Sequence, residues 1–439
     1  MIDCELPENI DDIGNNYEYV HENEDNIECN INNAEINIPV YNTDEFSFNY
    51  TPTPLVENIV KKQKKNIPLF VTISDMRVLS DFRGISFSNF QKGRAIKQLT
   101  ESLEKSLIEP ACYWCAELIC AGHFMDIWDC IFTFYGKCVH IANVRASMYM
   151  SLRLGAFKSI MMDELQGDDL AGRNSLKIRT MFCEIICVLC LSKRSYDLNY
   201  VRIPLSDFNI INLPNKLKAP NLQYGEPIIM QDDPRELFIS INELAYHVSQ
   251  DSLYLFYAHY WIEWILGYQL ILKKRKIVKK CGPRSFALVD PKYQCDLVWV
   301  IWDTFIKEAV LRGCLYEKII NYIIRLFSLR YTVACFIKRK HLLYLAAAIL
   351  CDSSFILNEE LVSTTQKSII SNILETINII YKQIKKNEQS PNKIDNFKEV
   401  THSQKNKKQS SNQLDIINEF NTLFVPRIDD KLNHKSCVH

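Results

Sequence analysis

The chain has 439 residues, with 52 Asp or Glu and 51 Lys or Arg. This length is sufficient for two or three domains, and an apolar content of 47% can fill substantial cores, which excludes a wholly disordered chain. Only 12 residues are Gly. This scarcity disfavours Gly-rich phosphate loops and doubly wound sheets, and it favours helices.

Charge is distributed unevenly along the chain. Residues 1–60 contain fourteen Asp or Glu and no Lys or Arg, which leaves 38 acids against 51 bases in the remainder, a net charge of +13. We expect residues 1–60 to form a disordered acidic tail, because such a segment cannot bury enough apolar surface to offset its ordering entropy. The basic body should attract polyanions, and the tethered tail should compete with them.

The elements that follow are predicted to be almost entirely helical. Residues 67–90 are rich in β-branched and aromatic side chains, which predicts a small extended or β segment, either a short strand pair or an extended arm. From Gly93 onward, apolar residues recur at three- and four-residue steps, the period of an amphipathic helix. Helices are expected at 95–107 with a stop at Pro110, then at 111–121, 125–139, 143–162, 174–191, 234–249, 252–274, 291–312, 316–329, 339–350, 358–385 and 413–424. Asp233 and Asp251 are expected to act as N-caps.

The predicted fold class is mainly α, a compact multi-helix bundle or stacked helical pairs. Residues 61–192 would form the arm and a first helical subdomain. Residues 193–233 carry four prolines and predict a long insertion loop. Residues 234–386 would form a second helical subdomain, followed by a polar basic tail at 387–439.

One segment, 253–272, is apolar enough to raise the question of membrane insertion. His259 and Glu263 lie near its centre, where a carboxylate in a bilayer costs roughly 2.5 kcal/mol or more. We therefore predict a buried core helix and no contact with a membrane. The pairs Trp261/Trp264 and Trp299/Trp302 each share a helix face and are expected to pack in the core, where the two helices could meet through them.

Lone acids on apolar helices need partners when they are buried. Glu117 and Glu184 are the only charged residues in two such runs. We predict that they form interhelical ion pairs with arginines, the candidates being Arg145, Arg153, Arg173 and Arg179.

The sixteen cysteines allow two interpretations. The chain opens without a secretory leader pattern, so we expect reduced thiols in an intracellular protein. The pairs Cys112/Cys115 and Cys187/Cys190, with Cys120, His123 and Cys183 nearby, could supply four ligands to a zinc ion. Both pairs lie inside apolar helical runs without a Gly-bearing knuckle, so core packing is favoured. We predict no metal site and no cofactor.

The sequence contains no complete catalytic motif. GxxxxGK[ST], GxSxG and HExxH are absent, although Glu243 and His247 share a helix face. A basic cluster after the aromatic helix predicts a nucleic-acid-binding surface, with a nuclear-import signal or a solvated helix end as alternatives. Its members are Lys273, Lys274, Arg275, Lys276, Lys279, Lys280 and Arg284.

The runs at 93–131 (GRAIKQLTESLEKSLIEPACYWCAELICAGHFMDIWDCI) and 233–248 (DPRELFISINELAYHV) resemble an uncharacterised helical protein family of large nucleocytoplasmic DNA viruses, of the mimivirus and phycodnavirus kind. The resemblance covers about 93–351 and brings no catalytic residues with it. It implies a viral protein that works inside an infected cell, in the host cytoplasm, the viral factory or the nucleus.

These observations predict a non-enzymatic helical interaction or scaffold protein that acts near replication, transcription or virion assembly and binds viral protein partners. The alternative is a nucleic-acid-binding accessory factor of replication or transcription, resembling the collar of a clamp loader without its ATPase. A weaker alternative is a zinc-stabilised enzyme.

Overall fold

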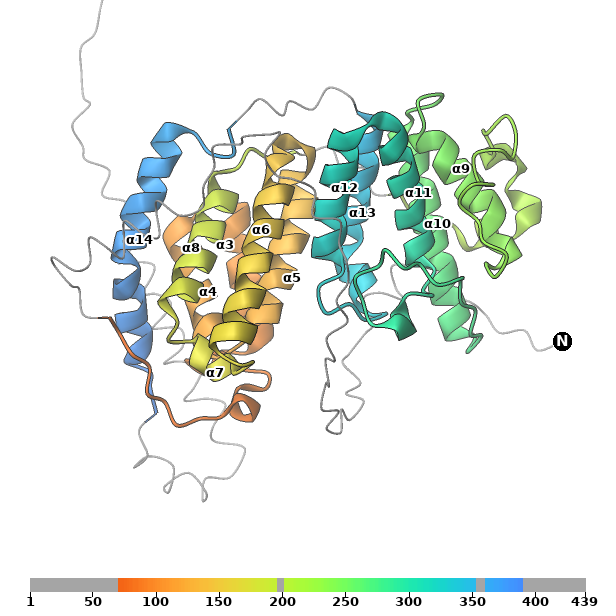
Figure 1. The fold of residues 1–439 in the computed structure, drawn as a ribbon. Coiled ribbons are helices and arrows are strands. Elements are labelled where there is room, and N and C mark those ends of the chain that lie inside the picture. Colours follow the sequence, from red (N-terminus) through yellow and green to blue (C-terminus); the bar gives the residue numbers. More distant parts are fainter. Residues whose placement is uncertain (1–69, 196–200, 353–359, 390–439) are drawn as a thin grey trace, which may run out of the picture. The chain divides into compact units, whose positions relative to one another are not determined.

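The computed structural model describes residues 70–195, 201–352 and 360–389. These residues form twelve α-helices and no strand, which confirms the mainly α prediction (Figure 1). Their single β feature is an isolated bridge between Ile85 and Gln91. The predicted acidic tail at 1–60, most of the basic tail and the helix at 413–424 lie outside the described residues.

The helices divide into two compact units. We call the described parts of residues 135–154 and 193–361 the central unit, and residues 70–134, 155–192 and 362–389 the terminal unit. This division differs from the predicted one, because residues 135–154 join the central unit and α14 (Thr364–Lys385) joins the terminal unit. The reason for the second difference is packing, since Tyr381 of α14 lies under the Arg179 guanidinium at 3.9 Å.

Two long helices of the terminal unit start at serine caps. The Ser175 hydroxyl accepts the Ile178 N–H at the start of α8, and Ser363 forms a capping box with Gln366 at the start of α14. Pro110 lies in the first turn of α4 and, contrary to the prediction, does not end the preceding helix. The unit comprises α3 (Lys92–Glu104), α4 (Ile108–Cys120), α5 (Phe124–Phe134), α7 (Asp169–Gly172), α8 (Leu176–Leu191) and α14, with the end of α6 (Arg145–Ser159).

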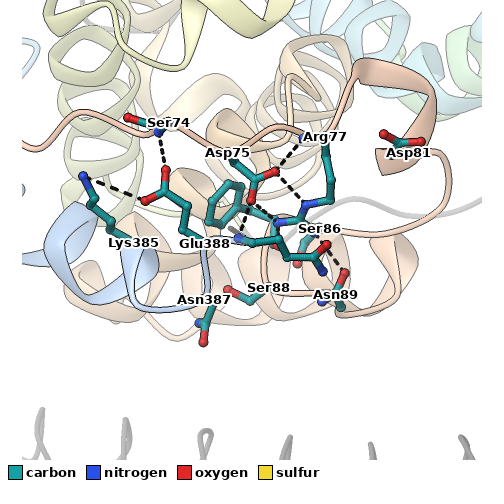
Figure 2. Close-up of polar contacts among 12 residues, drawn as sticks. Ser74, Asp75, Arg77, Asp81, Ser86, Ser88, Asn89, Lys385, Asn387 and Glu388 are labelled. Carbon is teal, nitrogen blue, oxygen red and sulfur yellow. Dashed lines mark hydrogen bonds and ion pairs between the residues drawn. The ribbon is translucent and has the colours of Figure 1, made fainter. Parts of the chain in front are cut away.

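Residues 70–78 form the extended arm and not a strand pair. Arg77 holds it in place, because the guanidinium lies over the rings of Phe82 and Phe87 at 4.6 and 5.0 Å and forms an ion pair with Asp75 at 2.8 Å. The end of α14 completes the attachment, since Gln389 donates its N–H to the Asp75 carboxylate at 2.8 Å. Figure 2 shows this polar network, in which the arm and the residues after α14 are joined.

The central unit contains the aromatic helix α10. Trp264 is buried as predicted, with its indole N–H bonded to the Asp207 carbonyl at 2.8 Å and its ring stacked on Tyr268. Trp299 and Trp302 are also buried, and both contact Phe327 of α12. The unit comprises the π-helical turn Tyr135–Val139, the beginning of α6, α9 (Phe238–Val248), α10 (Leu255–Lys274), α11 (Val298–Arg312), α12 (Cys314–Phe327) and α13 (Cys335–Cys351).

The predicted N-caps at Asp233 and Asp251 are wrong. The Asp233 carboxylate accepts two hydrogen bonds from Arg284, at 2.6 and 2.7 Å, and Asp303 lies 3.3 Å from the same guanidinium. Asp251 instead accepts the hydroxyl of Tyr224 at 2.6 Å. Both aspartates therefore hold distant segments together and do not cap the helices that follow them.

In the described ranges, no helix is both long enough and apolar enough to cross a bilayer. The segment expected to be a core helix forms α10, and His259 near its middle is buried.

Candidate functional site

The predicted basic cluster divides into a surface group and an interior residue. Lys273, Lys274, Arg275, Lys276 and Lys280 are exposed at and after the end of α10, and Lys279 forms an ion pair with Glu236. Arg284 is only 1% exposed and is bound to Asp233, so it cannot belong to a nucleic-acid-binding surface. We call the other six residues the basic segment.

The cysteines gather differently from the predicted pairs. The sulfur atoms of Cys112, Cys183 and Cys187 lie within 4.8 Å of one another, whereas Cys115, Cys120 and Cys190 are buried outside this group. His123 turns away from it, with its Nε2 atom 2.7 Å from the Ile85 carbonyl oxygen. Two CxxC pairs around one zinc ion are therefore not formed.

The predicted ion pair between Glu117 and an arginine is also wrong. The buried carboxylate instead accepts neutral donors, namely the Ser86 hydroxyl, the N–H and hydroxyl of Ser88, and the Tyr113 hydroxyl, at 2.5–3.1 Å. Burial raises the pKa of Glu117 despite these hydrogen bonds. The site needs no countercharge, because a protonated or hydrogen-bonded carboxyl group is tolerated in the interior.

The central unit carries a row of aromatic rings at its surface. Tyr254 and Phe256 are 52% and 46% exposed, and both rings contact Tyr257. From Tyr257 the row continues through His247 to Tyr246 and Tyr224, with ring centres 5.0–5.1 Å apart at each step. We call the five Tyr and Phe rings of this row the aromatic surface, since the His247 ring is buried beneath them.

A pocket of about 380 Å³ adjoins this row through Tyr224. One wall is the insertion, with Pro227 and Ile228, and the opposite wall is α11, with Lys307 and Leu311. Leu311 is 81% exposed although it is a large apolar residue. The pocket is therefore open and is bordered by apolar groups that water solvates poorly.

The insertion at 193–233 forms one wall of the pocket because buried polar side chains of α9 anchor its backbone. Glu243 accepts the N–H groups of Lys218 and Ala219 at 2.8 and 3.0 Å, and Asn242 accepts the N–H of Gly225 at 2.9 Å. A Cβ atom at Gly225 would lie 3.1 Å from Asn242, so this approach favours glycine. The predicted long loop is thus tied to α9 and holds Tyr224 in position.

Ser252, His247 and Glu243 form a row beneath the aromatic surface, and only its Ser252–His247 step is a hydrogen bond. The Ser252 hydroxyl is 3.0 Å from His247 Nδ1, and His247 Nε2 is 3.5 Å from the Glu243 carboxylate. A serine, a histidine and a carboxylate in this order raise the possibility of catalysed acyl transfer. That reaction also needs backbone N–H groups directed at the oxyanion of the intermediate. The N–H groups of residues 251–254 are already bonded to Ser249 or His247, so they do not supply such donors. This arrangement therefore favours a structural role.

Sequence reasoning missed the aromatic surface. The residues around α10 were predicted to be core because their spacing is helical, but the first turn of that helix leaves Phe256 at the surface. The signal that could have indicated exposure was the Ser-Gln-Asp-Ser turn just before the rings.

Comparison with known proteins identifies no relative: no protein-family model, no curated sequence and no solved structure matches the chain.

Proposed function

We propose that this chain is a non-catalytic interaction protein and that a protein partner binds to the aromatic surface and the adjoining pocket. The observation that carries the proposal is the exposure of Tyr254 and Phe256 beside an open pocket. Tyrosine-rich clusters around a pocket are typical of the residues that dominate binding energy at protein interfaces.

The chemistry of the surface indicates the kind of partner. Lys218 lies 5.9 Å from the Tyr257 ring centre, and Lys307 lines the pocket. Lys307 already donates to the Pro227 carbonyl oxygen and pairs with Asp303, whereas Lys218 is exposed. We therefore expect a segment that inserts an apolar side chain next to Leu311 and carries an acidic residue that faces Lys218. In line with the resemblance to a viral family, we propose that this partner is a viral protein engaged in replication, transcription or virion assembly.

The test is affinity capture of the full chain from cells that contain it, with and without nuclease. Wild type is compared with the double variant Tyr254→Ala/Phe256→Ala. Loss of two hot-spot rings costs at least about 2 kcal/mol, so a direct partner should be captured roughly 30-fold less well. Ile379→Ala, at a comparably exposed apolar residue on α14, is the matched control and should retain the partner.

A nuclease-resistant partner that is lost only from the double variant supports the proposal. Partners that are captured equally by both variants would place the interaction elsewhere on the chain.

A second candidate function, nucleic-acid binding, is favoured by one observation. Five cations of the basic segment are exposed within eight residues, beside Val278, which is 83% exposed. Such a segment can contact phosphates without sequence preference.

Charge reversal at Lys273, Lys274 and Lys276 tests this candidate. If these residues contact phosphates, single-strand affinity should fall and the slope of log K against log salt should decrease by about 0.7 for each phosphate that is no longer neutralised. Deletion of residues 1–60, which carry fourteen acids, should raise the affinity of the wild-type body at low salt. Unchanged affinity in both experiments would contradict the proposal that the chain binds nucleic acid.

A further inference from the structure

Three thiols from two helices converge inside the terminal unit. Cys183 and Cys187 are four residues apart on α8 and so share one face of the helix, and Cys112 approaches them from α4. The Cys112 and Cys183 sulfur atoms are 3.4 Å apart, and all three sulfur atoms lie within 4.8 Å of one another. All three residues are buried.

These separations suit a metal ion bonded to sulfur. A thiolate–metal bond of about 2.3 Å places three sulfur atoms about 4 Å apart when the ion lies at the centre of their triangle. The Cys112–Cys183 separation is shorter than that value and none of the three exceeds 4.8 Å, so an ion could bind with small movements of the side chains.

The helix that carries two of the thiols also carries a buried positive charge. Arg179 is one turn before Cys183 on the same face of α8 and is fully buried. Its guanidinium donates to three neutral oxygens, those of Val71, Arg173 and the Asn174 side chain. Its charge is therefore hydrogen-bonded, but none of these acceptors neutralises it, and a positive charge one helical turn before Cys183 can partly offset negative charge that an ion-binding thiolate would bring into the core.

We propose that Cys112, Cys183 and Cys187 form a binding site for one Cu(I) ion. Thiolates are soft ligands and select Cu(I), zinc or iron–sulfur clusters. In the described part of the chain no further Cys, His, Asp or Glu group joins the three. Structural zinc takes four ligands, whereas Cu(I) accepts a trigonal set of three sulfur atoms. The thiols release their protons to solvent as they bind, and the ion keeps its oxidation state.

The site is enclosed, so the ion should enter most readily while the chain folds. The full-length, reduced protein is refolded without oxygen in the presence of Cu(I) and a chromophoric Cu(I) chelator that competes for it. We expect one tightly held Cu(I) per chain with three sulfur neighbours in X-ray absorption.

Variants identify the ligands. Cys183→Ser should lower the affinity for Cu(I) at least about 100-fold, because loss of a ligand exceeds the 10–100-fold effect of outer-shell changes. Cys130→Ser is the matched buried control, since its thiol contacts Thr100 outside the cluster, and Cys314→Ser controls for exposed thiols. Both should bind as the wild type does. If Cys183→Ser does not fold, Cys183→Ala keeps the site apolar and serves in its place.

Equal Cu(I) binding by wild type and the Cys183 variants would overturn the proposal, as would less than stoichiometric copper in the wild type. Zinc retained at one equivalent against Cu(I) would overturn the assignment to copper.

Discussion

The two units differ in the chemistry of their interiors. The central unit buries four imidazoles, among them those of His140, His259 and His341, and the His259 and His341 rings contact Tyr344 at 4.4 and 5.7 Å. The terminal unit buries a cluster of three thiols and, on the same helix as two of them, Arg179. Both groups are uncharged at neutral pH in water, but imidazole gains a proton near pH 6.5, whereas a thiol loses one only above about pH 8. The two cores should therefore respond to different conditions.

Local geometry explains how the imidazoles come together. His140 follows the π-helical turn Tyr135–Val139 and has a φ of 49°, in the left-handed region. A Cβ atom at Gly136 would lie 2.9 Å from the His341 backbone, so this turn reaches α13 only because residue 136 is glycine. Strained turns of this kind persist where the surrounding structure holds them.

The largest expected effect is loss of the central unit in acid. Burial lowers the pKa of His140 to about 3 and the pKa of His259 and of His341 to about 4. These pKa values lie below the pKa of a histidine in the unfolded chain. The stability that these histidines contribute is therefore fully present above pH 6.5 and is lost as the pH drops towards 4. At pH 5 each histidine lowers the free energy of unfolding by about 2 kcal/mol, so the three together lower it by about 6 kcal/mol.

Hydrogen exchange followed by mass spectrometry at pH 7 and pH 5, corrected for intrinsic rates, checks this expectation. Peptides from α10 and α13 should lose protection before peptides from α4 and α8. His259→Gln should reduce the acid sensitivity by about a third. Ion pairing of Glu263 with Lys340 and the Lys137 charge near His341 should modify the midpoint slightly. Simultaneous loss of exchange protection in both units would contradict the expectation that the central unit is the more sensitive to acid.

The next effect concerns the buried ion pair of the central unit. Arg284→Met leaves Asp233 buried without its partner and should cost about 3–5 kcal/mol in the free energy of unfolding. Lys279→Met is the control, because it removes a partly exposed pair with Glu236 and should cost at most about 1 kcal/mol. Urea unfolding measures both, and similar losses would show that Arg284 is not structural.

Paired tryptophan truncations test whether each unit has its own core. Trp264→Ala in the central unit and Trp128→Ala in the terminal unit each remove a buried ring and should cost about 3–5 kcal/mol. We expect each variant to lose hydrogen-exchange protection mainly in its own unit. A stable, well-folded Trp264→Ala protein that has lost single-strand binding would show instead that this ring is exposed and functional.

The smallest expected effect lies at the buried carboxyl group of the terminal unit. Ser88→Ala removes the hydroxyl donor 2.5 Å from Glu117 and should cost about 1–3 kcal/mol. It should also raise the pKa of Glu117 further, since it removes one of the hydrogen bonds that lower this pKa. Ser159→Ala removes an exposed hydroxyl that donates to Asp163, and this control should leave the melting temperature nearly unchanged.

The positions of most helices could be predicted from the sequence alone. A 3.6-residue apolar period is a local property, so α8 and α10 were located to within a few residues. The burial of Trp264 followed from the same pattern, because a helix that is apolar all round must be covered by its neighbours.

Tertiary structure decided which residues meet. Arg284 looked like its basic neighbours in sequence, and only its contact with Asp233, 51 residues away, makes it a core residue. Cys112 and Cys183 are 71 residues apart and come together because α4 packs on α8. Likewise, Tyr254 and Phe256 share the composition of a buried helix, but the packing around them leaves their rings at the surface. Periodicity is encoded within a few residues, whereas such pairings depend on how whole helices pack, and no local pattern specifies that.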